Sequence, residues 1–542
     1  TGVTKNKMSM DWQSTNTMLY TATARYDWSN DKHSVGALVG TSYEHYKYER
    51  LAGSREEFPS DALTDMEAGS TSGAGYTNGA GSSEYKMLSY FARVNYTLMD
   101  RYLLEVNMRA DASSRFHKDH RWGYFPSFSA GWRMNEEGFM KDIKWINNLK
   151  IRASYGTLGN INNVGNYDYF QNYSSGNHYN FSDSPVIGIG ESKPANETLG
   201  WEKVALTDIG LDFDIFNGLL GVTADYYIKN TSDILLGYNV PTETGITAAP
   251  SQNIGKVKNT GFELALNHRN KIGAVNYSIG ANIATNKNKI TNLGGSDNII
   301  QTSSYIVKYI LKKGESIGSF YGFKTDGLYT QADIDAGHYY TLSGVVPNAG
   351  DVKFVPQRDI EYKQEITDED RTILGKDVPD FTYGVNLSLQ YKGFEFSMFG
   401  QGISGTKVAF DVYGVHPFYH GQDNPRKYHL KRWTEENPNP YAAYPRLYSA
   451  SSVHTTYNRN FSDYHLFDSD YFRFKTLSLG YTVPSATVKS WGLQSLKVYV
   501  TGENLFTVRA DKKMEDFDPE TAGGVIYTLG TKSVAFGVNI SF

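Results

Sequence analysis

The sequence has 542 residues, with 58 acidic and 53 basic side chains and a formal net charge of −5. It contains no run of about 18 apolar residues, which excludes a transmembrane helix, and no basic stripe, which argues against a nucleic-acid partner. Cysteine is absent, so disulfides and thiolate metal sites are excluded. Aromatic residues make up 14% of the chain, a high share that suits the two aromatic girdles of an outer-membrane β-barrel.

Alternation of apolar and polar side chains with a period of two recurs along the whole chain and predicts antiparallel strands. In one such stretch Tyr102 and Leu104 alternate with Glu105 and Arg109 on the opposite face. These charged residues, like Asp212 in a later stretch, indicate a water-filled lumen, because a dry sandwich core would not tolerate them. Fifteen strands are predicted, at residues 16–28, 31–48, 84–99, 100–112, 121–134, 148–158, 201–215, 219–232, 257–270, 273–290, 380–391, 393–404, 470–483, 494–506 and 531–542.

The connections between the predicted strands alternate between short turns and long loops. Outer-membrane barrels have short periplasmic turns and long external loops, so this alternation predicts the orientation of the sheet. Long loops are predicted at 49–83, 159–200, 233–256, 291–379, 405–469 and 507–530.

The last strand gives the clearest pattern, with Val534, Phe536 and Val538 on one face and small or polar residues on the other. We expect its apolar face to contact lipid. Bacterial single-chain barrels have even strand numbers, so fifteen strands imply that at least one is missing. The chain also begins at Thr1 without a signal peptide, so we expect a fragment or processed product whose sheet is closed by a second polypeptide.

Ten short motifs resemble the SusC/RagA family of TonB-dependent transporters in their order and spacing. The resemblance extends from about residue 84 to the end of the chain. The motifs are KIRASYGTLGN (150–160), GFE (261–263), PDFTYG (379–384), YKGFE (391–395), RWTEEN (432–437), YPRL (444–447), DYFRFK (470–475), LGYTVP (479–484), VYVTGENLF (498–506) and DPE (518–520).

The resemblance implies an all-β fold: a transmembrane antiparallel β-barrel of 22 strands, of which residues 1–542 would be the C-terminal part. The plug, the first seven strands and the segment that engages TonB would lie outside this chain, on an N-terminal polypeptide. The family also implies an outer-membrane location in a Gram-negative bacterium and a SusD-like lipoprotein lid. Its substrates are glycans or oligopeptides, so either is expected here.

No catalytic motif or cofactor-binding motif is visible, and we expect the chain not to be an enzyme. A loop rich in aromatic residues lies within 405–469, where rings could stack on a sugar or peptide face. Packing within the loop is the alternative, and a zinc site would need a third ligand. The candidate substrate-contact residues are Tyr413, His416, Phe418, Tyr419 and His420.

Asp368, Glu369 and Asp370 precede Arg371 at a place where members of the resembled family often carry a calcium-like loop. The segment Val355 to Ile366 lacks the acidic, glycine-bearing spacing of such a loop. We therefore expect a solvated acidic loop here and no metal site.

The strand pattern indicates an outer-membrane barrel, and the family resemblance implies an importer of glycans or oligopeptides that is driven by TonB and covered by a lid. Three other classes remain open at this point: a passive porin, a structural or adhesive barrel, and a soluble β-sandwich enzyme. A large, permanently open conductance would indicate the porin, and normal uptake in a strain that lacks the protein would indicate the structural or adhesive barrel. Ready extraction into buffer without detergent would indicate the soluble enzyme.

Overall fold

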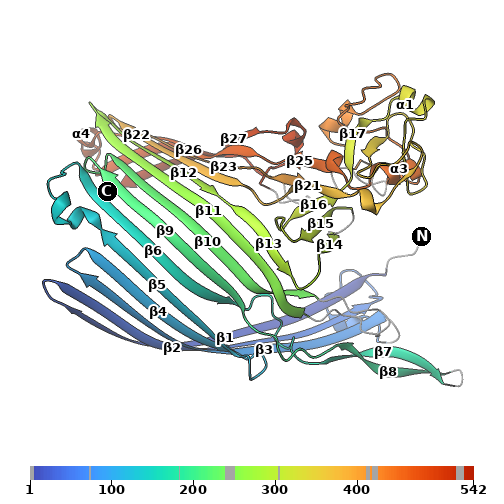
Figure 1. The fold of residues 1–542 in the computed structure, drawn as a ribbon, viewed down its shortest axis with the longest axis horizontal. Helices are drawn as coiled ribbons and strands as arrows, with labels where there is room; N and C mark the ends of the chain where they lie inside the picture. Colours follow the sequence, from blue (N-terminus) through green and yellow to red (C-terminus); the bar gives the residue numbers. More distant parts are fainter. Residues whose placement is uncertain are drawn as a thin grey trace. The chain divides into compact units, whose positions relative to one another are not determined.

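A large antiparallel sheet dominates the computed structural model, which describes residues 5–71, 75–181, 184–237, 251–302, 306–410, 416–417, 425–520 and 530–542 (Figure 1). Its strands follow one another in chain order, in the hydrogen-bonded sequence β1-β2-β3-β4-β5-β6-β9-β10-β11-β12-β22-β23-β26-β27-β28, with β13 paired to β11. The chain divides into two compact units: residues 1–132, 153–207 and 231–255, and residues 133–152, 208–230 and 256–542.

The strands of this sheet overlap the segments that the period-two pattern predicts, with two corrections. β1 begins at Lys7 instead of residue 16, because its pairing with β2 continues to Glu56, and the predicted strand 273–290 is divided between β12 and β13, which pairs with β11. β2 and β3 reach farther than expected into the predicted loop 49–83, because their pairing continues to Arg55 and Tyr76. The bounds are β1 Lys7–Ser29, β2 His33–Glu56, β3 Tyr76–Leu98, β4 Tyr102–Ser113, β5 Trp122–Arg133, β6 Ile146–Asn160, β9 Glu202–Ile215, β10 Leu220–Gly237, β11 Ser251–Ile272, β12 Val275–Thr285, β13 Lys287–Leu293, β22 Phe381–Tyr391, β23 Phe394–Ser404, β26 Tyr471–Thr482, β27 Ser495–Arg509 and β28 Ser533–Ser541.

The short turns are also where the sequence places them. Met99 and Asp100, between β3 and β4, both have positive φ angles (52° and 56°), as do Lys392 and Gly393 (47° and 88°) between β22 and β23. Two consecutive positive φ angles are typical of the tight hairpin turns whose twist matches that of the flanking strands.

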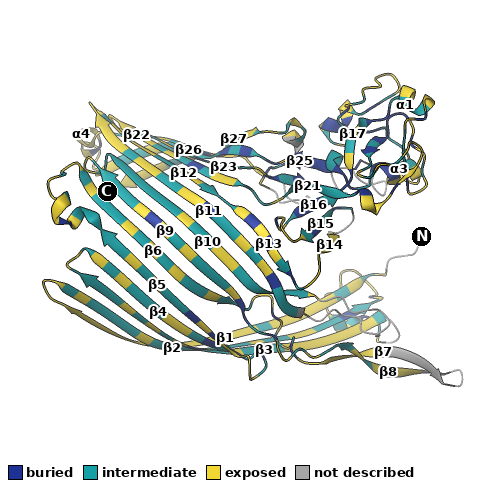
Figure 2. Cartoon of the chain, viewed as in Figure 1, coloured by how far each residue is buried: buried dark blue, intermediate teal, exposed yellow. Residues whose placement is uncertain are grey.

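The cross-strand register sorts the side chains onto two chemically different faces. Leu479 lies between Phe396 and Val500, and Val500 lies opposite Phe536. Phe536 is 83% exposed, and exposed positions recur along the strands (Figure 2). This row confirms the predicted apolar face, whose exposure is costly in water and favourable in lipid.

The opposite face of the same strands is polar. Ser478 lies between Ser397 and Thr501, and the Ser478 and Thr501 hydroxyls are 2.9 Å apart. Because a strand alternates its side chains, Ser397, Ser478 and Thr501 are each next in sequence to a residue of the apolar row and point to the opposite face.

The predicted long loops 291–379 and 405–469 contain small elements that the sequence pattern did not indicate (Figure 1). They enclose a core that includes Phe323, Phe354, Trp433 and Tyr457. The paired strands there are β14 Asn298–Thr302, β15 Lys308–Lys312, β16 Ser319–Gly322 and β21 Thr372–Lys376; β17 Lys324–Leu328 and β19 Val352–Val355; β18 Thr341–Leu342 and β20 Glu365–Ile366; and β24 Lys407–Ala409 and β25 Leu466–Asp468, with helices α1 Gln331–Asp335 and α3 Val453–Asn458.

The predicted loop 159–200 likewise contains a hairpin, formed by β7 Asn172–Phe181 and β8 Ser184–Lys193. A further short helix, α4 Ser485–Lys489, lies in the turn between β26 and β27. Within the part of the chain that the structure describes, no helix has the length and apolar character needed to cross a membrane.

Candidate functional site

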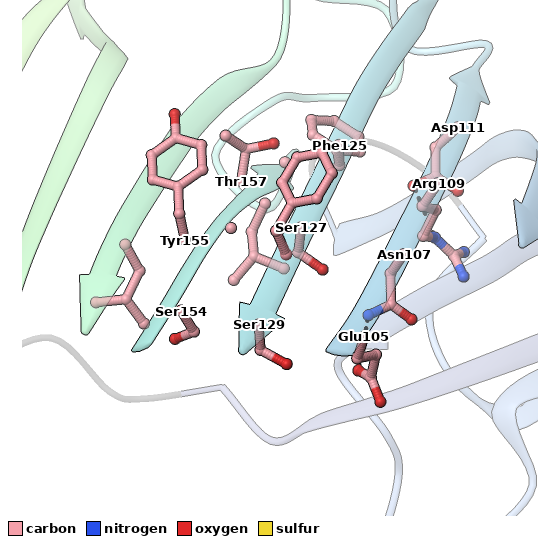
Figure 3. A pocket seen from close by; sticks show the side chains of 15 residues that line it. Glu105, Asn107, Arg109, Asp111, Phe125, Ser127, Ser129, Ser154, Tyr155 and Thr157 are labelled. Carbon is pink, nitrogen blue, oxygen red and sulfur yellow. Dashed lines mark hydrogen bonds and ion pairs between the residues drawn. The ribbon is translucent and has the colours of Figure 1, made fainter. Parts of the chain in front are cut away.

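The polar face of β4, β5 and β6 carries a ladder of charged and amide side chains around a cavity of about 490 Å³ (Figure 3). Arg109 donates from Nε to Asp111 Oδ2 (2.8 Å) and from Nη2 to Ser89 Oγ (3.0 Å). Asn107 donates to Glu105 Oε1 (2.8 Å). This is the wet face that the sequence predicts from Glu105 and Arg109.

Asp111 is the most buried member of this ladder, with 6% of its surface exposed. Its Oδ2 is paired with Arg109, whereas its Oδ1 has no hydrogen-bond partner among the described residues. Small side chains such as Ser127, Ser129 and Ser154 form the rest of the polar wall. A buried carboxylate oxygen without a described donor therefore lies in the wall of the cavity.

A second cluster on the polar face gathers three carboxylates around Arg152, which lies in the KIRASYGTLGN motif on β6. The guanidinium is 2.6 Å from Asp225, 3.2 Å from Asp212 and 3.5 Å from Asp208. Lys150 also lies 4.0 Å from Asp212. The two cations and the three carboxylates of this cluster have a summed formal charge of −1. The sequence places Asp212 on the face toward the lumen. Its partner Arg152 lies 60 residues away in the chain, and no pattern near either residue indicates the pairing.

A third cluster connects two motifs that are distant in the sequence, DYFRFK on β26 and DPE at 518–520. Arg473 lies 2.6 Å from Asp518 and 2.6 Å from Glu520, and Lys475 lies 2.8 Å from Glu520. Gln401 of β23 and the Tyr471 hydroxyl also donate to Glu520 (3.0 and 3.1 Å). These contacts fasten the segment 518–520 to the polar side of the sheet.

His416 is the one predicted substrate-contact residue that the structure describes, and it is buried in the loops. Its Nδ1 is 3.1 Å from the Tyr444 hydroxyl, and its ring lies 5.2 Å from that of His465. Burial, with a smaller contribution from His465, lowers the pKa of His416 well below its usual range, so the imidazole is neutral. Its role in substrate contact stays a prediction, and the other candidates, Tyr413, Phe418, Tyr419 and His420, lie outside the described residues.

The buried histidines make the loops sensitive to acid. Burial lowers the pKa of His465 from 6.5 to about 4, so the unfolded chain binds more protons than the folded chain between these values. Above pH 6.5 the neutral His465 makes its full contribution to the free energy of unfolding. As the pH falls toward 4 this contribution is lost, by up to about 3 kcal/mol.

We expect hydrogen exchange of residues 463–468, corrected for intrinsic rates, to be faster at pH 5 than at pH 7. The variant His465→Gln should flatten this dependence, because it removes a titrating group. Equal protection at both pH values in the unaltered protein would contradict the assignment.

The three acidic residues before Arg371 form a short turn whose central interaction is with arginine. Asp370 is fully buried and accepts from Arg358 at both oxygens (3.1 and 2.7 Å), and Asp368 accepts from Arg371 (2.7 Å). Burial alone raises the pKa of Asp370, but the Arg358 guanidinium and three backbone N–H groups lower it to about 2. The expected solvated loop is thus wrong for Asp370, because these donors compensate its burial.

Across the described ranges, no group of three or more His, Asp or Glu side chains is arranged to hold a metal ion. The three charged clusters on the polar face of the sheet consist of ion pairs and hydrogen bonds. They can bind and orient polar groups.

Comparison with known proteins identifies the family. Residues 3–505 match the family described as "TonB dependent receptor-like, beta-barrel". TonB-dependent receptor P3 of Formosa agariphila is 31% identical over 490 residues, which cover 89% of this chain and 47% of that protein. TonB-dependent receptor SusC of Bacteroides thetaiotaomicron is 29% identical over 467 residues, or 84% of this chain and 43% of SusC.

Among solved structures, the RagAB peptide transporter superposes with a TM-score of 0.82 at 26% identity, covering 99% of this chain and 56% of that one. The chain therefore belongs to the TonB-dependent receptor β-barrel family, whose members are outer-membrane proteins of Gram-negative bacteria. It resembles SusC and RagAB in particular, as the sequence motifs predicted. The chain spans about half the length of the relatives it matches.

Proposed function

We propose that the complete protein imports oligopeptides or glycans across the outer membrane in a process driven by TonB. The observation that carries this proposal is the two-faced sheet, with an exposed apolar row through Phe536 and a polar face bearing three clusters of charge. Lipid favours the first face, and a polar substrate in water is compatible with the second.

In this proposal residues 1–542 form the C-terminal part of a 22-stranded barrel. An N-terminal polypeptide would supply the remaining strands, the plug and the TonB contact. The sheet order supports a need for further strands, because in the described residues β1 and β28 are its two ends and each has one neighbour. Unpaired strand edges are not tolerated in lipid.

A SusD-like lipoprotein would cover the external loops as a lid. Relatives named SusC and RagAB support such a partner only by analogy. In this chain the folded loops between β12 and β22 and between β23 and β26 present a defined surface, with its own buried core, that a lid could contact.

Energised uptake is the test that separates an importer from the porin and from the structural or adhesive barrel. Cells with and without the complete gene would receive a mixture of labelled oligopeptides and oligosaccharides, before and after a protonophore collapses the proton gradient. We expect uptake that requires both the gene and the gradient. Gradient-independent uptake would favour the porin, and uptake unaffected by loss of the gene would favour the adhesive barrel.

A further inference from the structure

A second cavity, of about 450 Å³, lies where the folded loops meet the ends of β23 and β26. Its volume is within the range of pockets that bind small molecules. The residues that decide its chemistry are Tyr309, Phe320, Asp377, Gln401, Lys407 and Glu520.

One wall of this cavity is aromatic and fixed in position. The rings of Tyr309 on β15 and Phe320 on β16 are 4.9 Å apart, and Phe320 also packs 6.1 Å from Phe461. Phe320 is fully buried in the loop core, whereas Tyr309 is partly exposed. A flat group that enters the cavity would therefore meet the Tyr309 ring, which Phe320 supports from behind.

The negative charge of one lining residue, Glu520, is already paired with cations of the protein. Glu520 is paired with Arg473 and Lys475 and also accepts from Gln401. It completes the cluster on β26 and has little remaining capacity for a ligand.

Lys407 and Asp377 are different, since neither side chain has an ion pair or a hydrogen bond to another described residue; the Asp377 carboxylate interacts only with its own backbone N–H among these residues. The two are nevertheless held close to each other, because Thr406 Oγ1 donates to the Asp377 carbonyl oxygen (2.9 Å). Opposite charges in one cavity that do not bridge each other are each available to a ligand.

The stem of Lys407 is held by packing against Gly375. Gly375 has φ = +145°, and a Cβ at this position would lie 2.6 Å from Lys407 Cδ. The absence of a side chain at residue 375 thus leaves the space that the lysine stem uses on its way to the cavity.

We infer that this cavity binds a short peptide segment that carries both an ammonium and a carboxylate group, the carboxylate at Lys407 and the ammonium at Asp377. This inference rests on the proposed function and selects its substrate class. A neutral glycan would leave both charges unmatched, and an acidic glycan would pair with Lys407 but be repelled by Asp377. Charge-assisted hydrogen bonds are about twice as strong as neutral ones, so the zwitterionic ligand has the advantage.

The test is equilibrium binding to the complete transporter with its partners. The probes are a defined pool of unblocked tri- to pentapeptides containing one Lys and one Glu, a neutral oligosaccharide and an oligouronate. Lys407→Met keeps most of the stem, and Asp377→Asn keeps the shape of the side chain. We expect each variant to weaken peptide binding about tenfold, the size expected for loss of one charged hydrogen bond.

Lys313→Met and Asp297→Asn are matched controls, because both residues are exposed and neither lines the cavity. They should leave peptide binding unchanged. Oligouronate binding that strengthens in Asp377→Asn and weakens in Lys407→Met would overturn the peptide assignment in favour of an acidic glycan. Binding of the neutral oligosaccharide alone would also overturn it.

Uptake by the same variants separates failure of this inference from failure of the proposed function. Gradient-driven peptide uptake that is unchanged in both variants would refute the site and leave the importer intact. Loss of gradient dependence in the unaltered protein would instead refute the importer.

Discussion

Replacing Phe536 by Arg should destabilise the complete barrel in a lipid bilayer by about 2–4 kcal/mol, the cost of a cationic side chain on the lipid face near the membrane midplane. Phe536 lies in the apolar row with Val500 and Leu479 and is itself highly exposed. The measurement is a urea titration of the transporter in bilayers, read by heat-modifiable migration on gels.

Ala535→Arg is the matched control, since Ala535 is one residue away and lies opposite Thr501 on the polar face. It should cost much less, because its charge would face water. Equal losses for the two variants would contradict the assignment of faces.

Replacing Arg473 by Met should release the segment that ends at Glu520. Arg473 is buried and contacts both Asp518 and Glu520 at 2.6 Å. Breaking a buried ion pair costs about 3–5 kcal/mol, and we expect a loss near the lower limit because Lys475 still contacts Glu520. Hydrogen exchange of residues 512–520 measures this local stability.

A variant with Asp518→Asn and Glu520→Gln provides the control for Arg473→Met. In that background the same substitution should cost considerably less, because neutral amides do not require a cation. If it costs as much as in the unaltered protein, packing of the arginine stem rather than charge fastens the segment.

The strands of the large sheet could be predicted because their signal is local. In β28 the alternation of Val534 and Phe536 with Ala535 is visible within a few residues, and the tight turn at Met99 and Asp100 is equally local. A lipid-facing and a water-facing surface impose opposite demands on neighbouring residues, so the period of two persists along the chain.

The folded loops could not be predicted in the same way. β18 has two residues and β24 has three, too few to show any period. Their stability comes from contacts between distant segments, such as Phe323 with Phe354 and Tyr457. A pattern confined to neighbouring residues does not contain that information.

The charged clusters were predicted only in part. Glu105, Arg109 and Asp212 could be placed on the polar face from their spacing, but their partners depend on the register of neighbouring strands. Asp370 shows the same limit, because its buried pairing with Arg358 cannot be inferred from a run of three acidic residues. The cavity around Lys407 depends on five separate elements and had no signal in the sequence.

The central claim is that one face of this sheet contacts lipid and the other contacts water, and single-cysteine labelling tests it most directly. The chain contains no cysteine, so each introduced thiol reports on one position only. Residues 496–501 of β27 would be replaced one at a time in the membrane-embedded transporter and labelled with a water-soluble maleimide. We predict labelling at 497, 499 and 501 and protection at 496, 498 and 500; the reverse pattern, or no alternation, would contradict the claim.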